Sequence, residues 1–114
     1  HAACDQVVSP THVPDLADAV LDLAIDGETG IWHLSHGEAM SWADFGKTLA
    51  RACGLDPELI IPVSGRELGW RARRPTFVPL ASDRGGLLPP LSHAVERFTR
   101  EVQSMIARES RMAA

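Results

Sequence analysis

The fold of this chain is decided by its first quarter, ACDQVVSPTHVPDLADAVLDLAIDG (residues 3–27). Residues 3–8 predict a short strand, which Ser9-Pro10-Thr11 interrupts. A helix then begins near Pro14, because proline needs no amide donor in a first helical turn, and ends near Gly27. Its apolar residues recur at helical spacing on one face: Leu16, Ala19, Val20, Leu23 and Ala24. The first unit is therefore a strand followed by a helix.

The same alternation continues along the chain. Residues 30–35 predict a mostly buried strand, and residues 42–53 predict an amphipathic helix that Ser41 caps. We expect the large side chains of Trp32 and Trp42 in the core. These two segments form a second strand–helix unit.

The second half of the chain is less regular. Residues 59–63 predict a third strand, in which Pro62 requires an edge position or a strand end. Residues 64–90 predict a long loop, which in a compact domain is more often functional or disordered. A last helix begins at Leu91, and its end, residues 108–114, is expected to fray. Its apolar stripe consists of Leu91, Ala94, Val95, Phe98, Val102, Met105 and Ile106.

The predicted order is strand, helix, strand, helix, strand, loop, helix. This alternation favours an α/β fold with a small, partly parallel sheet and about three helices. The length of 114 residues suits one domain, or a piece of one, over residues 1–114.

Charge and composition bear on which partners the chain can have and on where it is located. Residues 1–64 carry ten acidic and two basic side chains, and residues 65–114 carry five acidic and nine basic. The second half can therefore attract an anion, but the net charge of −4 makes nucleic acid an unlikely partner. No apolar run predicts a membrane span or a signal peptide, so we expect a cytoplasmic protein. The two cysteines, Cys4 and Cys53, are expected to be free and buried, and no metal cluster is predicted.

Two absences bear on catalysis. The chain has no tyrosine and one lysine, Lys47, so it contains no Tyr-x-x-x-Lys pair. Its nine glycines never form a glycine-rich loop between a strand and a helix, as a dinucleotide pyrophosphate requires. We therefore assign no catalytic and no cofactor-binding residue.

Polar residues at the first strand end are one candidate for binding. Asp5, Gln6, Ser9 and Thr11 surround the turn before the first helix, where short polar groups and free amides often meet a ligand. The alternative is local turn chemistry, in which Ser9 and Thr11 bond the nearby backbone.

The segment after residue 69 is the other candidate. Arg71, Arg73 and Arg74 lie within four residues, and the arginine fork pairs bidentately with phosphate oxygens. The alternative is a solvated loop that pairs with the acidic first half. Trp70 could stack on a base or close a pocket, or it could dock the loop on the core.

These motifs together resemble the dTDP-4-dehydrorhamnose reductase family of extended short-chain dehydrogenases/reductases. Residues 5–17 are similar to the family's D-Q-x-G-x-P-T-x-x-x-D-L-A segment, and residues 30–45 to its next strand and serine-capped helix. Residues 73–84 resemble its R-P-x-x-S-x-L-x-S-x-K/R stretch, and residues 88–91 its ending. The sequence departs from the pattern at Val8, Val78 and Ala81.

The resemblance implies the carboxy-terminal, substrate-binding part of a Rossmann-type protein. The longer protein would reduce the C4 keto group of dTDP-4-dehydro-L-rhamnose with NADPH or NADH in dTDP-L-rhamnose synthesis. The Rossmann cofactor domain is expected outside this chain, which would bind no cofactor itself. Arg73 and Arg74 would hold the diphosphate or nucleotide, while Asp5, Gln6 and Thr11 would shape the sugar pocket or the domain hinge.

The partners implied are a dTDP-sugar, the Rossmann domain and further copies of the chain. Apolar surface left by the missing domain favours self-association into a homo-oligomer. The alternative function is a non-enzymatic binding, regulatory or protein-interaction module of the same family.

Overall fold

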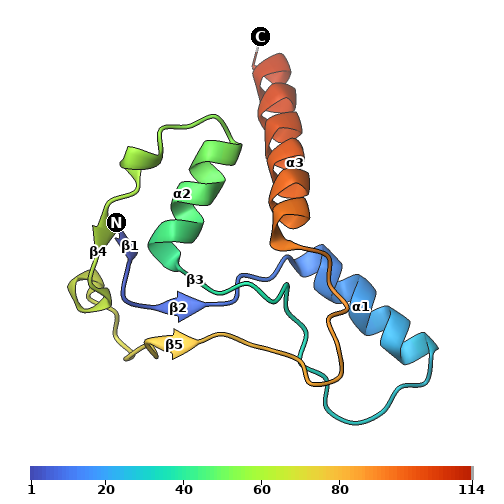
Figure 1. Cartoon of the computed structure of the whole chain (residues 1–114). Coiled ribbons are helices and arrows are strands. Elements are labelled where there is room, and N and C mark those ends of the chain that lie inside the picture. Colours follow the sequence, from blue (N-terminus) through green and yellow to red (C-terminus); the bar gives the residue numbers. More distant parts are fainter. Residues whose placement is uncertain (114) are drawn as a thin grey trace.

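A computed structural model describes residues 1–113 and shows a mixed α/β fold (Figure 1). Two small sheets replace the single sheet that the sequence predicts. In one, β1 (Ala2–Ala3) pairs in parallel with β4 (Pro62–Val63). In the other, β2 (Val7–Val8) lies between antiparallel β3 (Met40–Ser41) and parallel β5 (Phe77–Val78).

Three α-helices confirm the helical predictions. They are α1 (Val13–Ile25), α2 (Trp42–Ala52) and α3 (Leu91–Met112). In Figure 1, α2 and α3 lie beside each other above β2 and β5, β1 and β4 lie to the left of α2, and α1 extends to the lower right from near the base of α3. Two 3₁₀ turns, η1 (Pro57–Leu59) and η2 (Gly65–Leu68), flank β4.

Helix ends follow their local signals. The Ser41 hydroxyl accepts the Asp44 amide at 3.0 Å and donates to the Asp44 carboxylate at 2.7 Å, which closes the start of α2. Gly54 follows α2 with a φ of 72°, a left-handed conformation that side chains rarely adopt. α3 continues to Met112 and is not frayed from residue 108, and Ala114 lies outside the described residues.

The strand predictions were only partly right. Residues 3–8 form two short strands with a turn between them, and the third strand is shorter than residues 59–63 because η1 occupies its start. The loop over residues 64–90 contains η2 and β5. No strand forms over residues 30–35, because this extended segment has no neighbouring strand to pair with.

The core is thin and lies mainly between α2 and α3. Its buried apolar residues are Ala3, Ala19, Ala43, Ala50, Leu91, Ala94 and Val95. Phe45 and Leu49 pack partly against it. Trp42 is not in the core, since it is 43% exposed, and Trp32 is only half-buried. Both cysteines are free as predicted, but Cys4 is exposed and Cys53 half-buried, which corrects the expectation of burial.

Candidate functional site

Asp5 and Gln6 hold the start of η2 beside β1. The Asp5 carboxylate accepts the Ser64 hydroxyl at 2.7 Å and the Gly65 amide at 2.8 Å. The Gln6 side chain is buried so close to Gly65 that a Cβ there would lie 2.4 Å from its Nε2. These two residues therefore fix the segment that leads into the arginines.

The contacts of Asp5 predict that the stability of the fold depends on pH. The Gly65 amide and the Ser64 hydroxyl lower the pKa of Asp5 below its ordinary value of 3.8. A lowered folded-state pKa stabilises the fold at higher pH, and this contribution disappears as pH falls through it. Between about pH 5 and pH 3, we expect the urea midpoint of the wild type to fall more than that of Asp5→Asn. Asp18→Asn, at an exposed position, is the control. If the urea midpoints of the wild type and of both variants fell equally between these pH values, Asp5 would not have this role.

Trp70, Arg73 and Arg74 lie on the exposed segment between η2 and β5. The Arg74 guanidinium stands 6.0 Å from the centre of the Trp70 ring, a cation–π distance. Pairing of β5 with β2 brings the end of this segment beside β2, where the Val7 amide donates to the Thr76 carbonyl at 2.8 Å. Asp5, Gln6, Trp70 and both arginines therefore lie on adjoining segments at one end of the molecule.

No acidic partner neutralises this arginine segment within residues 1–113. None of the ion pairs in that range involves Arg71, Arg73 or Arg74, so they do not pair with the acidic first half. The three guanidinium groups remain exposed to solvent. Three exposed guanidinium groups, of which Arg74 lies beside the Trp70 ring, suit a ligand that carries both phosphate and a planar ring.

Thr11 is separated from the other predicted site residues. It follows β2 at the start of α1, and its hydroxyl donates to the Ser9 carbonyl at 3.1 Å. The structure therefore gives Thr11 the local turn chemistry that was the alternative to ligand binding.

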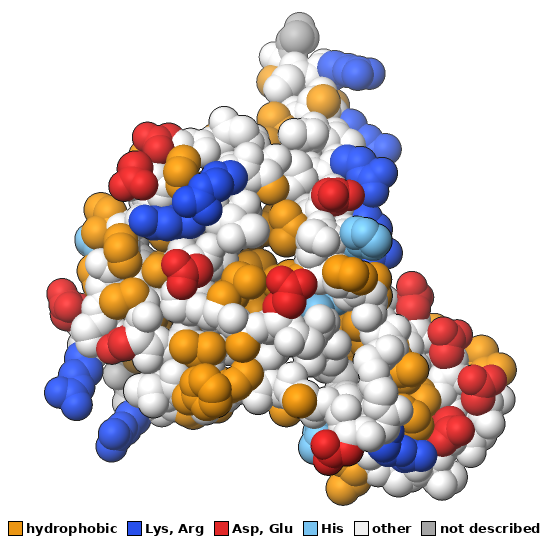
Figure 2. Space-filling view, in the orientation of Figure 1, with side chains coloured by type: hydrophobic (Ala, Val, Ile, Leu, Met, Phe, Trp, Pro, Cys, Tyr) orange, Lys and Arg blue, Asp and Glu red, His pale blue; other side chains and the backbone are white. Residues whose placement is uncertain are grey.

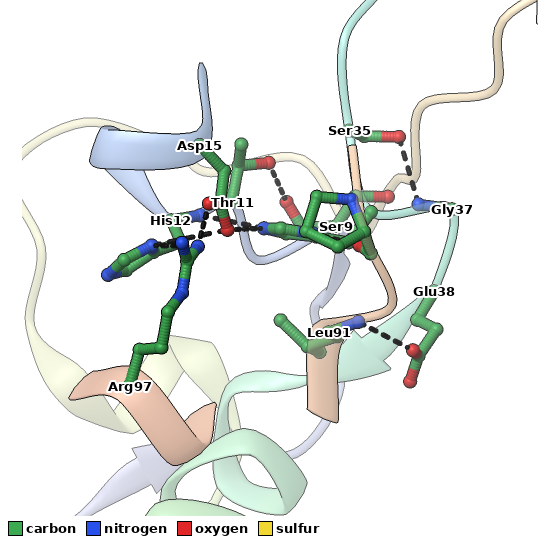
Figure 3. A network of polar contacts seen from close by, with 11 residues as sticks. Ser9, Thr11, His12, Asp15, Ser35, Gly37, Glu38, Leu91 and Arg97 are labelled. Carbon is green, nitrogen blue, oxygen red and sulfur yellow. Dashed lines mark hydrogen bonds and ion pairs between the residues drawn. The ribbon is translucent and has the colours of Figure 1, made fainter. Parts of the chain in front are cut away.

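A polar junction that sequence reasoning missed lies close to Thr11 (Figure 3). Asp15 in the first turn of α1 is buried, with its side chain 4% exposed. His12 Nδ1 lies 3.2 Å from its carboxylate, which also pairs with the guanidinium of Arg97 from α3. His36 from the extended segment lies 3.6 Å from the same carboxylate. The junction, defined by Asp15, His12, His36 and Arg97, joins α1 to α3.

The contacts of the two His36 ring nitrogens indicate its tautomer. Its Nδ1 lies 2.6 Å from the Pro89 carbonyl, which can only accept, so Nδ1 carries the proton. Its Nε2 lies 3.1 Å from the His12 amide and accepts from it. Both ring nitrogens are thus used in packing, and His36 serves as a connector between α1 and the start of α3.

An apolar groove of about 500 Å³ adjoins the junction. Pro10–Pro14 form one wall, Trp42, Phe45 and Leu49 of α2 another, and α3 supplies Leu91, Ala94, Val95, Phe98 and Glu101. Figure 2 shows hydrophobic side chains in the hollow between α2 and α3. The groove offers little polar chemistry and suits an apolar surface.

A second aromatic–arginine contact is structural. The Arg84 guanidinium lies 3.9 Å from the Trp32 ring centre, pairs with Glu28 at 3.1 Å and donates to the Thr29 carbonyl at 2.7 Å. Because these bonds occupy Arg84, it joins two long loops and is not available to bind a ligand.

The N-caps of the three α-helices in residues 1–113 are His12, Ser41 and Pro90, so no glycine-rich turn of the kind that holds a dinucleotide pyrophosphate precedes a helix there. In residues 1–113, no three His, Cys, Asp or Glu side chains are grouped to hold a metal ion. No helix in that range has both the length and the apolar character needed to cross a membrane.

Comparison with known proteins identifies relatives over most of the chain. Residues 1–110 match the model of the RmlD substrate binding domain. The dTDP-4-dehydrorhamnose reductase of Mycobacterium tuberculosis is 36% identical over 92 residues, which cover 78% of this chain and 30% of that protein. The dTDP-4-keto-6-deoxy-D-glucose reductase of Streptomyces niveus is 32% identical over 109 residues, or 93% of this chain and 38% of that protein.

A solved structure shares the fold. The dTDP-4-dehydrorhamnose reductase of Bacillus anthracis, determined in complex with NADP, aligns with a TM-score of 0.77 and 29% identity. The alignment covers 88% of this chain and 37% of that one, so the chain spans about a third of the length of the relatives it matches. The family match covers nearly all of the chain, and the chain belongs to the RmlD substrate binding domain family.

Proposed function

We propose that this chain binds the nucleotide diphosphate of a dTDP-sugar through the arginine segment. The observation that carries this proposal is the exposed set of Arg71, Arg73 and Arg74, which has no acidic partner in residues 1–113. Arg74 of this set lies beside Trp70. Cationic forks pair with diphosphate oxygens, and the indole offers a face to the thymine ring. The relatives, which are named as reductases of dTDP-sugars, support this ligand class.

Each site residue has a role that follows from its position. Arg74, already beside the indole, and Arg73 contact the diphosphate. Asp5 and Gln6 act through η2, because their contacts with Ser64 and Gly65 set where the following segment begins. Thr11 shapes the hinge at the start of α1.

The reaction of the longer protein is proposed from what its relatives are named for. Reductases that act on dTDP-sugars match this chain over about a third of their own length. We propose that residues 1–114 act as the substrate-binding domain of such a reductase, which reduces the C4 keto group of dTDP-4-dehydro-L-rhamnose. The nicotinamide cofactor and the catalytic Tyr-x-x-x-Lys pair would then belong to a Rossmann domain outside this chain, since these residues contain neither site.

Titration of the chain with dTDP by calorimetry tests the binding site. We expect Arg74→Ala to weaken binding by about tenfold to a hundredfold, since hydrogen bonds to charged groups contribute about 1.5–3 kcal/mol. The control is Arg100→Ala, because Arg100 is an exposed arginine on α3, outside the arginine segment. Equal affinities for Arg74→Ala and the wild type would remove Arg74 from the site. A folded wild type that binds no dTDP would favour the protein-interaction alternative.

A further inference from the structure

A threonine follows the arginine segment directly. Arg73 and Arg74 stand three and two residues before Thr76, and Arg71 stands five residues before it. No other serine or threonine of the sequence has arginine at both the second and the third position before it. Protein kinases select their substrates partly by such charge patterns around the hydroxyl. The sequence around Thr76 therefore suits a kinase that recognises arginine.

The structure leaves Thr76 open to an enzyme. Residues 69–78 are all exposed, and residues 70–75 make no hydrogen bond within residues 1–113. The Thr76 carbonyl accepts from the Val7 amide at 2.8 Å, but the Thr76 hydroxyl has no hydrogen-bond partner in the same part of the chain. β5, which follows Thr76 at the edge of the sheet in Figure 1, is two residues long. A segment with so few bonds can open locally and lie extended in the cleft of another enzyme.

Ser110 shows what a less suitable hydroxyl looks like. It has Arg108 two residues before it, but Ala107 at the third position. Ser110 lies within α3, and its hydroxyl donates to the Ile106 carbonyl at 2.9 Å. The helix would have to unwind before this hydroxyl could enter an enzyme cleft. Thr76 thus differs from Ser110 both in its arginines and in its local structure.

A phosphate on Thr76 would lie among cations. The group carries a charge of about −1.5 to −2 at neutral pH. Residues 68–82 contain no acidic side chain, and the arginines of this segment form no ion pair within residues 1–113. Because guanidinium groups pair bidentately with phosphate oxygens, Arg73 and Arg74 are its nearest partners along the chain. The phosphate would then occupy the groups that the proposed function assigns to the nucleotide diphosphate.

We propose that Thr76 is a phosphorylation site for a protein kinase that recognises arginine, and that its phosphate blocks the nucleotide site. The second part rests on the proposed function. The kinase transfers the γ-phosphoryl group of ATP to Thr76 Oγ1. The bond between Oγ1 and phosphorus forms, and the bond from the γ-phosphorus to the bridging oxygen breaks. ADP leaves with that electron pair, and the hydroxyl proton passes to the catalytic aspartate of the kinase.

Phosphorylation in vitro tests the site. The probe is the catalytic subunit of cyclic-AMP-dependent protein kinase with ATP and Mg²⁺, and tandem mass spectrometry locates the phosphate. We expect the phosphate on Thr76 and a rate about tenfold lower for Arg73→Ala, because a charge that the kinase recognises is lost. Arg100→Ala, at an exposed arginine of α3, is the matched control and should keep the wild-type rate. Phosphate found only on other residues, or equal rates for Arg73→Ala and the wild type, would overturn the site.

Calorimetric titration with dTDP tests the block. We expect the phosphorylated chain to bind dTDP about tenfold more weakly than the unmodified chain, or weaker still, because the new phosphate competes for the arginines. Thr76→Val should bind dTDP with the same affinity before and after treatment with the kinase. Unchanged affinity of the phosphorylated wild type would overturn the block. If the unmodified chain binds no dTDP, the proposed function and the block are both wrong, whereas the modification site is decided by mass spectrometry alone.

Discussion

Replacement of Asp15 with alanine is expected to lower the free energy of unfolding by about 3 kcal/mol, the lower end of the cost of breaking a buried ion pair. The Asp15 side chain is 4% exposed, but Arg97 is 38% exposed and can partly return to water, which reduces the loss. The contact of His12 Nδ1 with the same carboxylate is lost as well. Because small domains are stable by only about 5–15 kcal/mol, the change is a large fraction of the total. Urea denaturation monitored by circular dichroism measures it.

The same helix provides the control. Asp18 is exposed and forms no ion pair within residues 1–113, so Asp18→Ala should change stability by less than about 0.5 kcal/mol. Equal effects of the two substitutions would mean that the junction does not hold α1 to α3. A loss confined to Asp15→Ala would show that a polar contact, and not apolar packing alone, positions α1.

The helices could be predicted because their signals are local. Pro14 in the first turn of α1, the Ser41 cap and the left-handed Gly54 each act within a few residues, and all three lie where the sequence placed them. The strands depend on distant partners and were predicted less well. β5 is two residues long and is a strand only because β2 lies beside it. Residues 30–35 instead contact the 80–84 segment, through the Ser35 hydroxyl on the Leu80 carbonyl and Arg84 on Trp32.

The candidate site, like the strands, depends on contacts between residues far apart in the chain. Short polar groups at a strand end pointed to Asp5 and Gln6, but their neighbours Ser64 and Gly65 are far along the chain, and no sequence pattern connects them. The helix dipole favours an acidic residue in the first turn of α1, which Asp15 satisfies. Asp15 is buried together with its ion-pair partner Arg97, and this contact forms only when α3 packs beside α1.

Leu91→Ala is expected to cost about 3 kcal/mol, because truncation of a buried leucine loses transfer free energy and leaves a cavity. Leu91 is 4% exposed at the start of α3, where it packs with Ala94, Val95 and the partly buried Phe45. Leu91 is the largest of the buried apolar residues, most of which are alanines. Chemical denaturation of the wild type and the variant at the same protein concentration measures the loss.

Leu87→Ala is the control, because it truncates an exposed leucine and so shows how much of the loss of stability depends on burial. Leu87 precedes α3 by a few residues and is 46% exposed, so its truncation should cost less than about 1 kcal/mol. If the two variants were equally stable, α3 would not be seated on α2 through Leu91. If only Leu91→Ala is destabilised, the start of α3 is its anchor.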